Sequence, residues 1–347
     1  MVAIHIHKPV AAAVVFACTA TVPVDPAMAD PVEDFYRGKA INLYIGTTPG
    51  GGYDVYARLV ARHMGAHIPG KPLIVPRSMP GAGTRTAAGY VYNVVAKDGL
   101  SLNASEQALA LEQALGDETM QFDSSQFNWI GSANSDNKVV VTWHTSGIAT
   151  VEDAKAREVV MGATSDTTSS QYIRAMNAVA GTRFKIIHGY PGGNEINLAM
   201  EKGEVAGRGS SSWATWKARP NLLRDRKVNV LVQIGLSKSA DLTPVPLLMD
   251  LAGRDEERAM LKLLSAPSAI GHPLTTSPGV PAERVKALRD AFDATMKDPS
   301  FLAEAEHAKL EIDPVPGVEL ARIAAEILSS PKAIRDKLAS IVLVRKR

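Results

Sequence analysis

Short apolar segments alternate with segments of helical periodicity along most of the chain. Residues 40–45 alternate apolar and polar side chains, as a half-buried strand does. A glycine-rich loop follows, and then a segment with apolar side chains at helical spacing. The same order of strand, polar or glycine-rich loop and helix recurs at residues 73–75, 159–162 and 184–187. This alternation predicts an α/β architecture with mostly parallel sheets.

The last third of the chain has a different pattern. From Pro281 onward helical periodicity dominates, with Val285, Leu288 and Phe292 on one amphipathic face. The full length of 347 residues is enough for two domains, each with a core of its own. We therefore expect a two-domain α/β protein with a helical C-terminal part.

The N-terminus has the order of a secretory signal. Lys8 precedes an apolar stretch at residues 10–17, and Ala27-Met28-Ala29 has the small residues of a cleavage site. The stretch is too short to span a membrane. This predicts that residues 1–29 are a signal peptide and that the mature protein is periplasmic. The alternative is a lipoprotein anchored at Cys18, the single cysteine of the chain, although Phe16 fits such a signal poorly.

Composition excludes one class of partner. The formal net charge is only +2, without the basic excess that a nucleic-acid surface normally has. We therefore predict no nucleic-acid partner.

Glycine-rich loops stand directly before predicted helices in both halves. Residues 49–52 read Pro-Gly-Gly-Gly, and residues 191–193 read Pro-Gly-Gly before Asn194. A helix N-terminus offers free N–H groups and the positive end of the helix dipole, and glycine lets an anion approach the backbone. Such loops are also used simply as tight turns. Their occurrence in both halves favours anion binding, because ligands of open α/β sheets lie beyond the carboxyl ends of strands.

Enzyme and cofactor motifs are missing from the sequence. Residues 81–86 lack the third glycine of a dinucleotide fingerprint, and no loop has the Gly-Lys-Ser/Thr of a P-loop. His63 and His67 have a zinc-compatible spacing, but no third ligand is evident nearby. The hydroxyl-rich residues 164–170 lack an identifiable base, and they suit hydrogen bonding to an oxyanion. We predict no metal and no cofactor.

Several residues have two interpretations at this stage. Trp213 and Trp216 fit a pocket wall or a helical core position. Arg208 fits bidentate pairing with a ligand carboxylate or the closing of a surface turn. Asp54 fits helix capping better than a role as a ligand for a cation. Tyr53, Tyr56 and Tyr190 leave room for a ring-bearing acid, although a tyrosine at such a place is often only a wall residue.

Taken together, the motifs resemble the extracytoplasmic receptors of tripartite tricarboxylate transporters, the Bug family of solute-binding proteins. The resemblance rests on the order and spacing of segments at residues 49–59, 79–83, 189–193, 203–205, 242–246 and 278–281. It implies the type II periplasmic-binding-protein fold, with two domains, a hinge and a ligand cleft between them. The implied first domain comprises residues 30–139 plus 266–347, and the second comprises residues 140–265.

The resemblance also implies a small carboxylate ligand, held by backbone N–H groups and small polar side chains, and a multi-helix membrane permease as partner. Glu106 departs from the small or polar residues common at its position. The expected ligand contacts are Thr48, Pro49, Gly50, Gly51, Gly52, Tyr53, Asp54, Ser105, Gln107, Thr164, Ser165, Thr168, Ser169, Ser170, Tyr190 and Ser210.

Alternative functions are a sensory receptor with the same ligand and a secreted α/β enzyme that acts on a carboxylate. The enzyme would need a titratable group aimed into the cleft.

Overall fold

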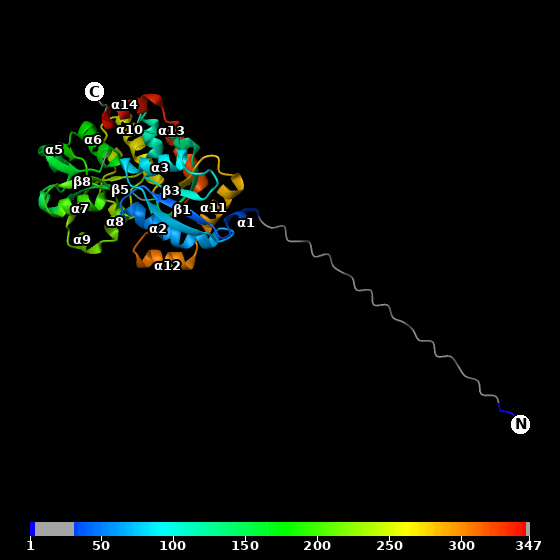
Figure 1. Cartoon of the computed structure of the whole chain (residues 1–347). Coiled ribbons are helices and arrows are strands. Elements are labelled where there is room, and N and C mark those ends of the chain that lie inside the picture. Colours follow the sequence, from blue (N-terminus) through cyan, green and yellow to red (C-terminus); the bar gives the residue numbers. More distant parts are fainter. Residues whose placement is uncertain (4–30, 119, 136, 165, 345–347) are drawn as a thin grey trace.

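The computed structural model describes residues 1–3, 31–118, 120–135, 137–164 and 166–344 (Figure 1). The predicted cleavage site and Cys18 lie outside these residues, so the signal peptide stays a prediction. Among the described residues, none of the helices combines the length and the apolar character needed to cross a bilayer.

Helices and strands alternate along most of the chain. The strands are β1 (Ala40–Ile45), β2 (Leu73–Ser78), β3 (Ser101–Ala104), β4 (Asn128–Ser132), β5 (Lys138–Trp143), β6 (Val159–Gly162), β7 (Phe184–Ile187), β8 (Gly207–Ser212), β9 (Val228–Ile234), β10 (Pro273–Thr276) and β11 (Val315–Pro316). The helices are α1 (Pro31–Tyr36), α2 (Gly52–Met64), α3 (Arg85–Asn93), α4 (Leu109–Ala114), α5 (Val151–Ala156), α6 (Thr168–Ala180), α7 (Gly193–Glu201), α8 (Trp213–Lys217), α9 (Pro220–Arg224), α10 (Asp255–Ser265), α11 (Ala282–Thr295), α12 (Pro299–His307), α13 (Gly317–Leu328) and α14 (Lys332–Val342).

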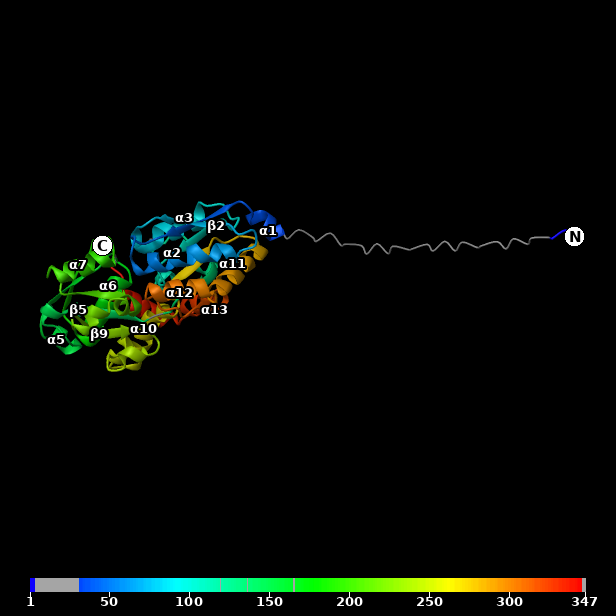
Figure 2. The same cartoon turned by 90° about the horizontal axis from the view of Figure 1, so that it is seen from below.

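Within the described residues the strands form two sheets. The first has the order β11-β4-β10-β3-β1-β2 and the second the order β7-β6-β8-β5-β9. The chain leaves the first sheet after β4 and returns to it at β10. Figures 1 and 2 show the two sheets in neighbouring lobes, with α5, α6 and α7 in one lobe and α2, α3 and α11 in the other. The predicted two-domain α/β fold is confirmed.

The sheets are mixed, which corrects the expectation of mostly parallel sheets. In the first sheet β1 is parallel to β2 and β3, whereas β10 is antiparallel to both β3 and β4. In the second sheet β6 is parallel to β7 and β8, whereas β5 is antiparallel to β8 and β9. The antiparallel pairs arise where the chain changes sheets, because the arriving strand does not follow a strand–helix–strand crossover.

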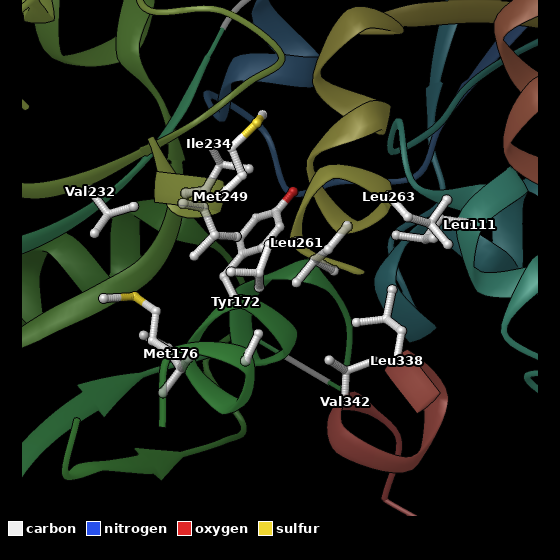
Figure 3. Packing of buried hydrophobic residues seen from close by; sticks show 14 of the residues in the cluster. Leu111, Tyr172, Met176, Val232, Ile234, Met249, Leu261, Leu263, Leu338 and Val342 are labelled. Carbon is white, nitrogen blue, oxygen red and sulfur yellow. The ribbon is translucent and has the colours of Figure 1, made fainter. Parts of the chain in front are cut away.

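Buried apolar side chains join the two lobes near the C-terminus. One core cluster contains Leu111 of α4, Tyr172 and Met176 of α6, Leu261 of α10 and Val342 of α14 (Figure 3). The helix α14 packs against α6 and α10, so the end of the chain reaches the lobe built on the second sheet. At the start of α6, the hydroxyl of Thr168 donates a hydrogen bond to Glu106, so this end of the helix lies beside the loop after β3.

The two tryptophans belong to the core of the second lobe. Trp213 is 6% exposed and Trp216 is 1% exposed, and both pack in one apolar cluster. The indole Nε1 of Trp216 donates a hydrogen bond to Oγ of Ser211 over 2.6 Å. Of the two interpretations of these residues, the core position is the observed one.

Candidate ligand-binding site

Loops at the carboxyl ends of strands from both sheets surround one cavity of about 300 Å³. The first sheet provides the loops after β1, β2 and β3, and the second provides the loops after β6 and β7. The helices α2, α6 and α7 begin at three of these loops, and β8 runs along the wall. The position agrees with the rule that ligands of open α/β sheets bind beyond the carboxyl ends of strands.

The loop after β1 is held by Asp54, in the first turn of α2. Its carboxylate accepts a hydrogen bond from the N–H of Gly50 (2.8 Å) and one from Nε of Arg58 (2.7 Å), and the residue is 2% exposed. Gly50 has a φ of 78°, which glycine adopts without steric cost. Asp54 therefore fixes the loop from behind.

The second lobe contributes hydroxyl groups and a glycine turn. Thr164 Oγ1 and Ser169 Oγ lie 3.3 Å apart at the start of α6. Gly192 and Gly193 start α7 and line the cavity. A Cβ atom at Gly193 would lie 2.7 Å from the guanidinium of Arg208, so glycine is needed for this close packing.

Arg208, in β8, brings a guanidinium to the cavity wall. Its Nη1 donates to the carbonyl of Gly193 and to Oδ1 of Asn197, both over 3.0 Å, and its Nε donates to the carbonyl of Ser210 over 3.0 Å. Burial, with a smaller contribution from the charge of Arg219, lowers the pKa of Arg208 to about 10. The guanidinium is still charged at neutral pH. Asn197 is 5% exposed, and within the described part of the chain its Nδ2 has no hydrogen-bond partner.

A second group of titratable side chains lines the cavity and comes from the loop after β3 and from β5. The carboxylate of Glu106 accepts a hydrogen bond from the hydroxyl of Thr168, which joins the loop after β3 to the start of α6. Burial raises the pKa of Glu106, against the hydrogen bond from Thr168 and the charges of Lys138 and Arg85. Lys138, at the start of β5, is 3% exposed, and its Nζ lies 5.4 Å from the ring centre of Tyr53.

His272 completes this part of the wall. It is 6% exposed, and its ring stacks on Tyr56 with 4.3 Å between ring centres. Burial and, second, the charge of Lys138 hold the pKa of His272 well below its ordinary value, although a backbone hydrogen bond to Asn134 raises it. The imidazole is therefore neutral at pH 7. Within the described residues its ring makes no hydrogen bond to a hydroxyl group.

The structure brings many of the expected contact residues together. Those that line the cavity are Thr48, Gly51, Gly52, Tyr53, Thr164, Thr168, Ser169, Tyr190 and Ser210. Others lie beside it: Pro49 and Gly50 are exposed, whereas Asp54, Ser105, Gln107 and Ser170 are buried behind the wall. Ser165 lies outside the described residues.

The wall also contains residues that the sequence patterns did not indicate as ligand contacts. Lys138, Asn197, Thr215 and His272 line the cavity but belong to no recognisable motif. They come from β5, from α7 and α8, and from the segment before β10, and only the fold brings these parts together. Arg208 lines the cavity and also donates to the carbonyl of Gly193 in the glycine turn, and its pairing with a ligand carboxylate stays a prediction.

The histidines with zinc-compatible spacing are engaged elsewhere. His63 Nε2 lies 2.6 Å from Oε2 of Glu304, and His67 Nε2 lies 2.8 Å from Oδ2 of Asp298. In the described ranges, groups of three or more potential metal ligands are absent.

Comparison with known proteins gives the class of fold. The fold is that of two-domain periplasmic solute-binding proteins, and it is shared with the periplasmic binding protein BugD at a TM-score of 0.69 and 16% identity over 88% of this chain and 99% of that one. The Rhodopseudomonas palustris protein Rpa4515, whose structure contains adipate, has a TM-score of 0.67 and 18% identity over 88% and 98% of the two chains. MatC of the same organism, with bound malate, has a TM-score of 0.65 and 15% identity over 87% and 99%.

A relative was also found by sequence. The chain is 26% identical over 340 residues to a UPF0065 protein of Cupriavidus necator, covering 95% of this chain and 96% of that one. No protein-family model matches the chain. The similarity to Bug-type solute-binding proteins that the motifs indicate is confirmed.

Proposed function

We propose that this chain is an extracytoplasmic solute-binding protein, which captures a small carboxylate in the cavity and delivers it to a membrane transporter of the tripartite tricarboxylate type. The observation that carries the proposal is the convergence of helix N-termini and a buried guanidinium on one cavity. The helices α2, α6 and α7 begin there, and Arg208 lines its wall. Helix N-termini and cations both stabilise a bound anion.

The size of the cavity and the ligands of similar proteins support this proposal. A volume of about 300 Å³ lies at the lower end of the range for small-molecule sites. Two proteins of the same fold have been solved with small dicarboxylates, one with adipate and one with malate. We extend this class of ligand, the small carboxylates, to the present chain.

The proposed mechanism is closure of two domains around the ligand. We propose that residues 30–139 plus 266–347 form the first domain and residues 140–265 the second, with α14 packed across to α6. The boundary at residue 139 falls inside β5, whose first residues Lys138 and Val139 already pair in the second sheet. Contacts such as that of Glu106 with Thr168 join loops of the two sheets at the cavity. A ligand that touches both loop sets favours the closed form, because only that form makes all of its contacts.

We propose binding without catalysis. The cavity contains a titratable group, Glu106, which an enzyme would need. However, its observed partner is the hydroxyl of Thr168, and within the described residues neither a histidine nor a lysine is hydrogen-bonded to that hydroxyl. Among the described residues, Thr168 is therefore not part of the trio of nucleophile, base and orienting group that acyl-transfer enzymes use, and this supports the proposal.

Periplasmic location and a multi-helix permease partner follow from the proposed role and from the predicted signal peptide. A sensory receptor for a membrane signalling protein would use the same closed form. A permease gene beside the gene of this protein favours transport, and a sensor kinase gene in that place favours signalling.

The test is a thermal-shift screen of the purified protein against mono-, di-, tri- and aromatic carboxylates. A ligand that binds only the folded state raises the melting temperature as its concentration increases. We expect at least one acid to do so, and expect Arg208→Met to abolish the shift. The matched control is Arg183→Met, because Arg183 is exposed and lies outside the cavity. If no acid shifts the wild type, or Arg208→Met responds fully, the proposal is wrong.

A further inference from the structure

The walls of the cavity have two different chemical characters. On one side Arg208 and Asn197 lie at the glycine turn that starts α7. On the other side are Glu106 and Lys138, from the loop after β3 and from β5. In the antiparallel pairing of β5 with β8, Arg208 lies opposite Val141, whereas Lys138 lies opposite Ser212 at the other end of the strand pair. The two groups therefore lie at separate parts of the cavity wall.

The Arg208 side suits a carboxylate. A guanidinium, an amide side chain that is 5% exposed and the backbone of a helix N-terminus all offer hydrogen-bond donors there. The Nδ2 of Asn197 has no partner within the described part of the chain, so a ligand oxygen would give this buried donor its missing hydrogen bond.

The Glu106 side does not suit a second carboxylate. An ionised Glu106 accepts hydrogen bonds and repels an anion, and the repulsion is strong where water is largely excluded. The ammonium group of Lys138 is close enough to stabilise the ionised form of Glu106. Arg85, the other cation that acts on Glu106, is already paired with Glu112 and Asp117. Lys138 and Glu106 therefore offset each other at the wall, and this end of the cavity favours an uncharged polar group over either an anion or a cation.

We propose that Glu106 determines specificity, and that the preferred solute is a monocarboxylate whose far end carries an uncharged hydrogen-bond donor, such as a carboxamide or hydroxyl group, in place of a second carboxylate. This inference rests on the proposed binding function. The donor group of the ligand bonds to the Glu106 carboxylate, which already accepts from Thr168. Glu106 therefore bonds to the ligand and also joins the two loop sets.

Matched pairs of acids test this directly. The probes are succinate and succinamate, glutarate and glutaramate, and adipate and adipamate, which differ only in the exchange of one carboxylate for a carboxamide. Calorimetric titration measures the affinity of each. For at least one pair we expect the wild type to bind the monoamide at least about tenfold more tightly than the diacid, since one mismatched buried polar contact has this order of effect.

The decisive variant is Glu106→Gln, whose side-chain oxygen still accepts from Thr168 while its amide donates to a carboxylate. We expect the tenfold preference to disappear or to reverse in this variant. The control is Glu195→Gln, because Glu195 is exposed near the start of α7 and outside the cavity wall. It makes the same change in charge, and we expect it to keep the wild-type preference.

Each outcome separates the two proposals. If the diacids bind the wild type as tightly as the monoamides, or if Glu106→Gln leaves the preference intact, the inference on Glu106 is wrong and the binding function stands. If no acid of any pair binds the wild type, the inference is wrong, and the binding function is decided by the thermal-shift screen, whose panel also contains tricarboxylates and aromatic acids. The wild-type preference is measured without any variant, so it tests the proposal even if Glu106→Gln does not fold.

Discussion

Gly192 is the position where a single methyl group should obstruct domain closure while requiring, within its own lobe, only a shift of the exposed Glu195 carboxylate, which the new Cβ would approach to 2.9 Å. It lies between β7 and α7, and it faces the loop that follows β1. A Cβ atom at this position would lie 2.2 Å from Oγ1 of Thr48. The φ of Gly192 is −165°, an extended conformation that alanine adopts without strain.

The size of the effect follows from this contact. A separation of 2.2 Å is far below any van der Waals distance, so Thr48 must change rotamer or the two loops must separate. Overpacking of this kind costs about 1–3 kcal/mol. Because the cost falls on the closed form alone, we expect Gly192→Ala to weaken carboxylate binding by about 5- to 150-fold. The melting temperature without ligand should stay unchanged or rise slightly, since alanine restricts the unfolded chain.

The assay is calorimetric titration with the acid found by thermal shift, together with urea unfolding of the free protein. Gly89→Ala is the matched control, because a Cβ there meets only Phe122, at 3.8 Å. A double-mutant cycle with Thr48→Ala adds a specific test: without Oγ1, the next atom of residue 48 is its Cβ at 3.4 Å, an ordinary contact. Gly192→Ala should therefore cost less affinity in the Thr48→Ala background.

Two results would refute the reasoning. If Gly192→Ala binds as tightly as the wild type, binding does not need the contact between these loops. If it lowers the stability of the free protein and leaves the affinity unchanged, the contact belongs to the ligand-free state and closure is not driven by the ligand.

Three further predictions concern stability and its dependence on pH. The pKa of His272 is lowered in the folded state, so the unfolded chain takes up a proton first as the pH falls through about 6.5, and the free energy of unfolding decreases below that pH. His272→Phe should reduce the difference in this free energy between pH 7 and pH 5, measured by urea titration, and a difference equal to that of the wild type would contradict the prediction. Gly131→Ala places a Cβ 2.2 Å from the buried ring of Phe292 and should lower the free energy of unfolding by about 1–3 kcal/mol in urea titrations, whereas an unchanged midpoint would show that the ring moves aside freely. Asp54→Ala leaves the N–H of Gly50 without its carboxylate partner and should lower that free energy by about 1–3 kcal/mol and weaken ligand binding, so unchanged values for both would exclude a role of Asp54 in fixing the loop.

Local sequence patterns predicted the elements that depend on local forces. The strand at residues 40–45 and the strands at residues 159–162 and 184–187 are observed with the expected bounds, because apolar alternation and flanking glycines define them. Gly181 ends α6 with a φ of 71°, as expected of a glycine C-cap. The antiparallel strands were not predicted, since strand direction depends on where the chain changes sheets.

The candidate site was predictable only in part, for the same reason. Glycine loops before helices are local signals, and both of them lie at the cavity. Lys138 and His272 are 134 positions apart in the sequence, and neither has a local pattern that indicates a pocket. Asp54 was expected to cap α2, but its carboxylate accepts from the N–H of Gly50, in the loop before the helix, and from Arg58. The burial of Ser105, Gln107 and Ser170 behind the wall follows from the exact rotation of their loops.

The central claim is that a small carboxylate binds in the cavity between the two sheets. A crystal structure of the protein grown with the acid of largest thermal shift tests it most directly. The account predicts a carboxylate in the cavity, with its oxygens about 3 Å from donors of Arg208 and of the glycine loops at residues 50–53 and 191–194. An acid bound elsewhere, or bound in the cavity without contact to these loops and to Arg208, would contradict it.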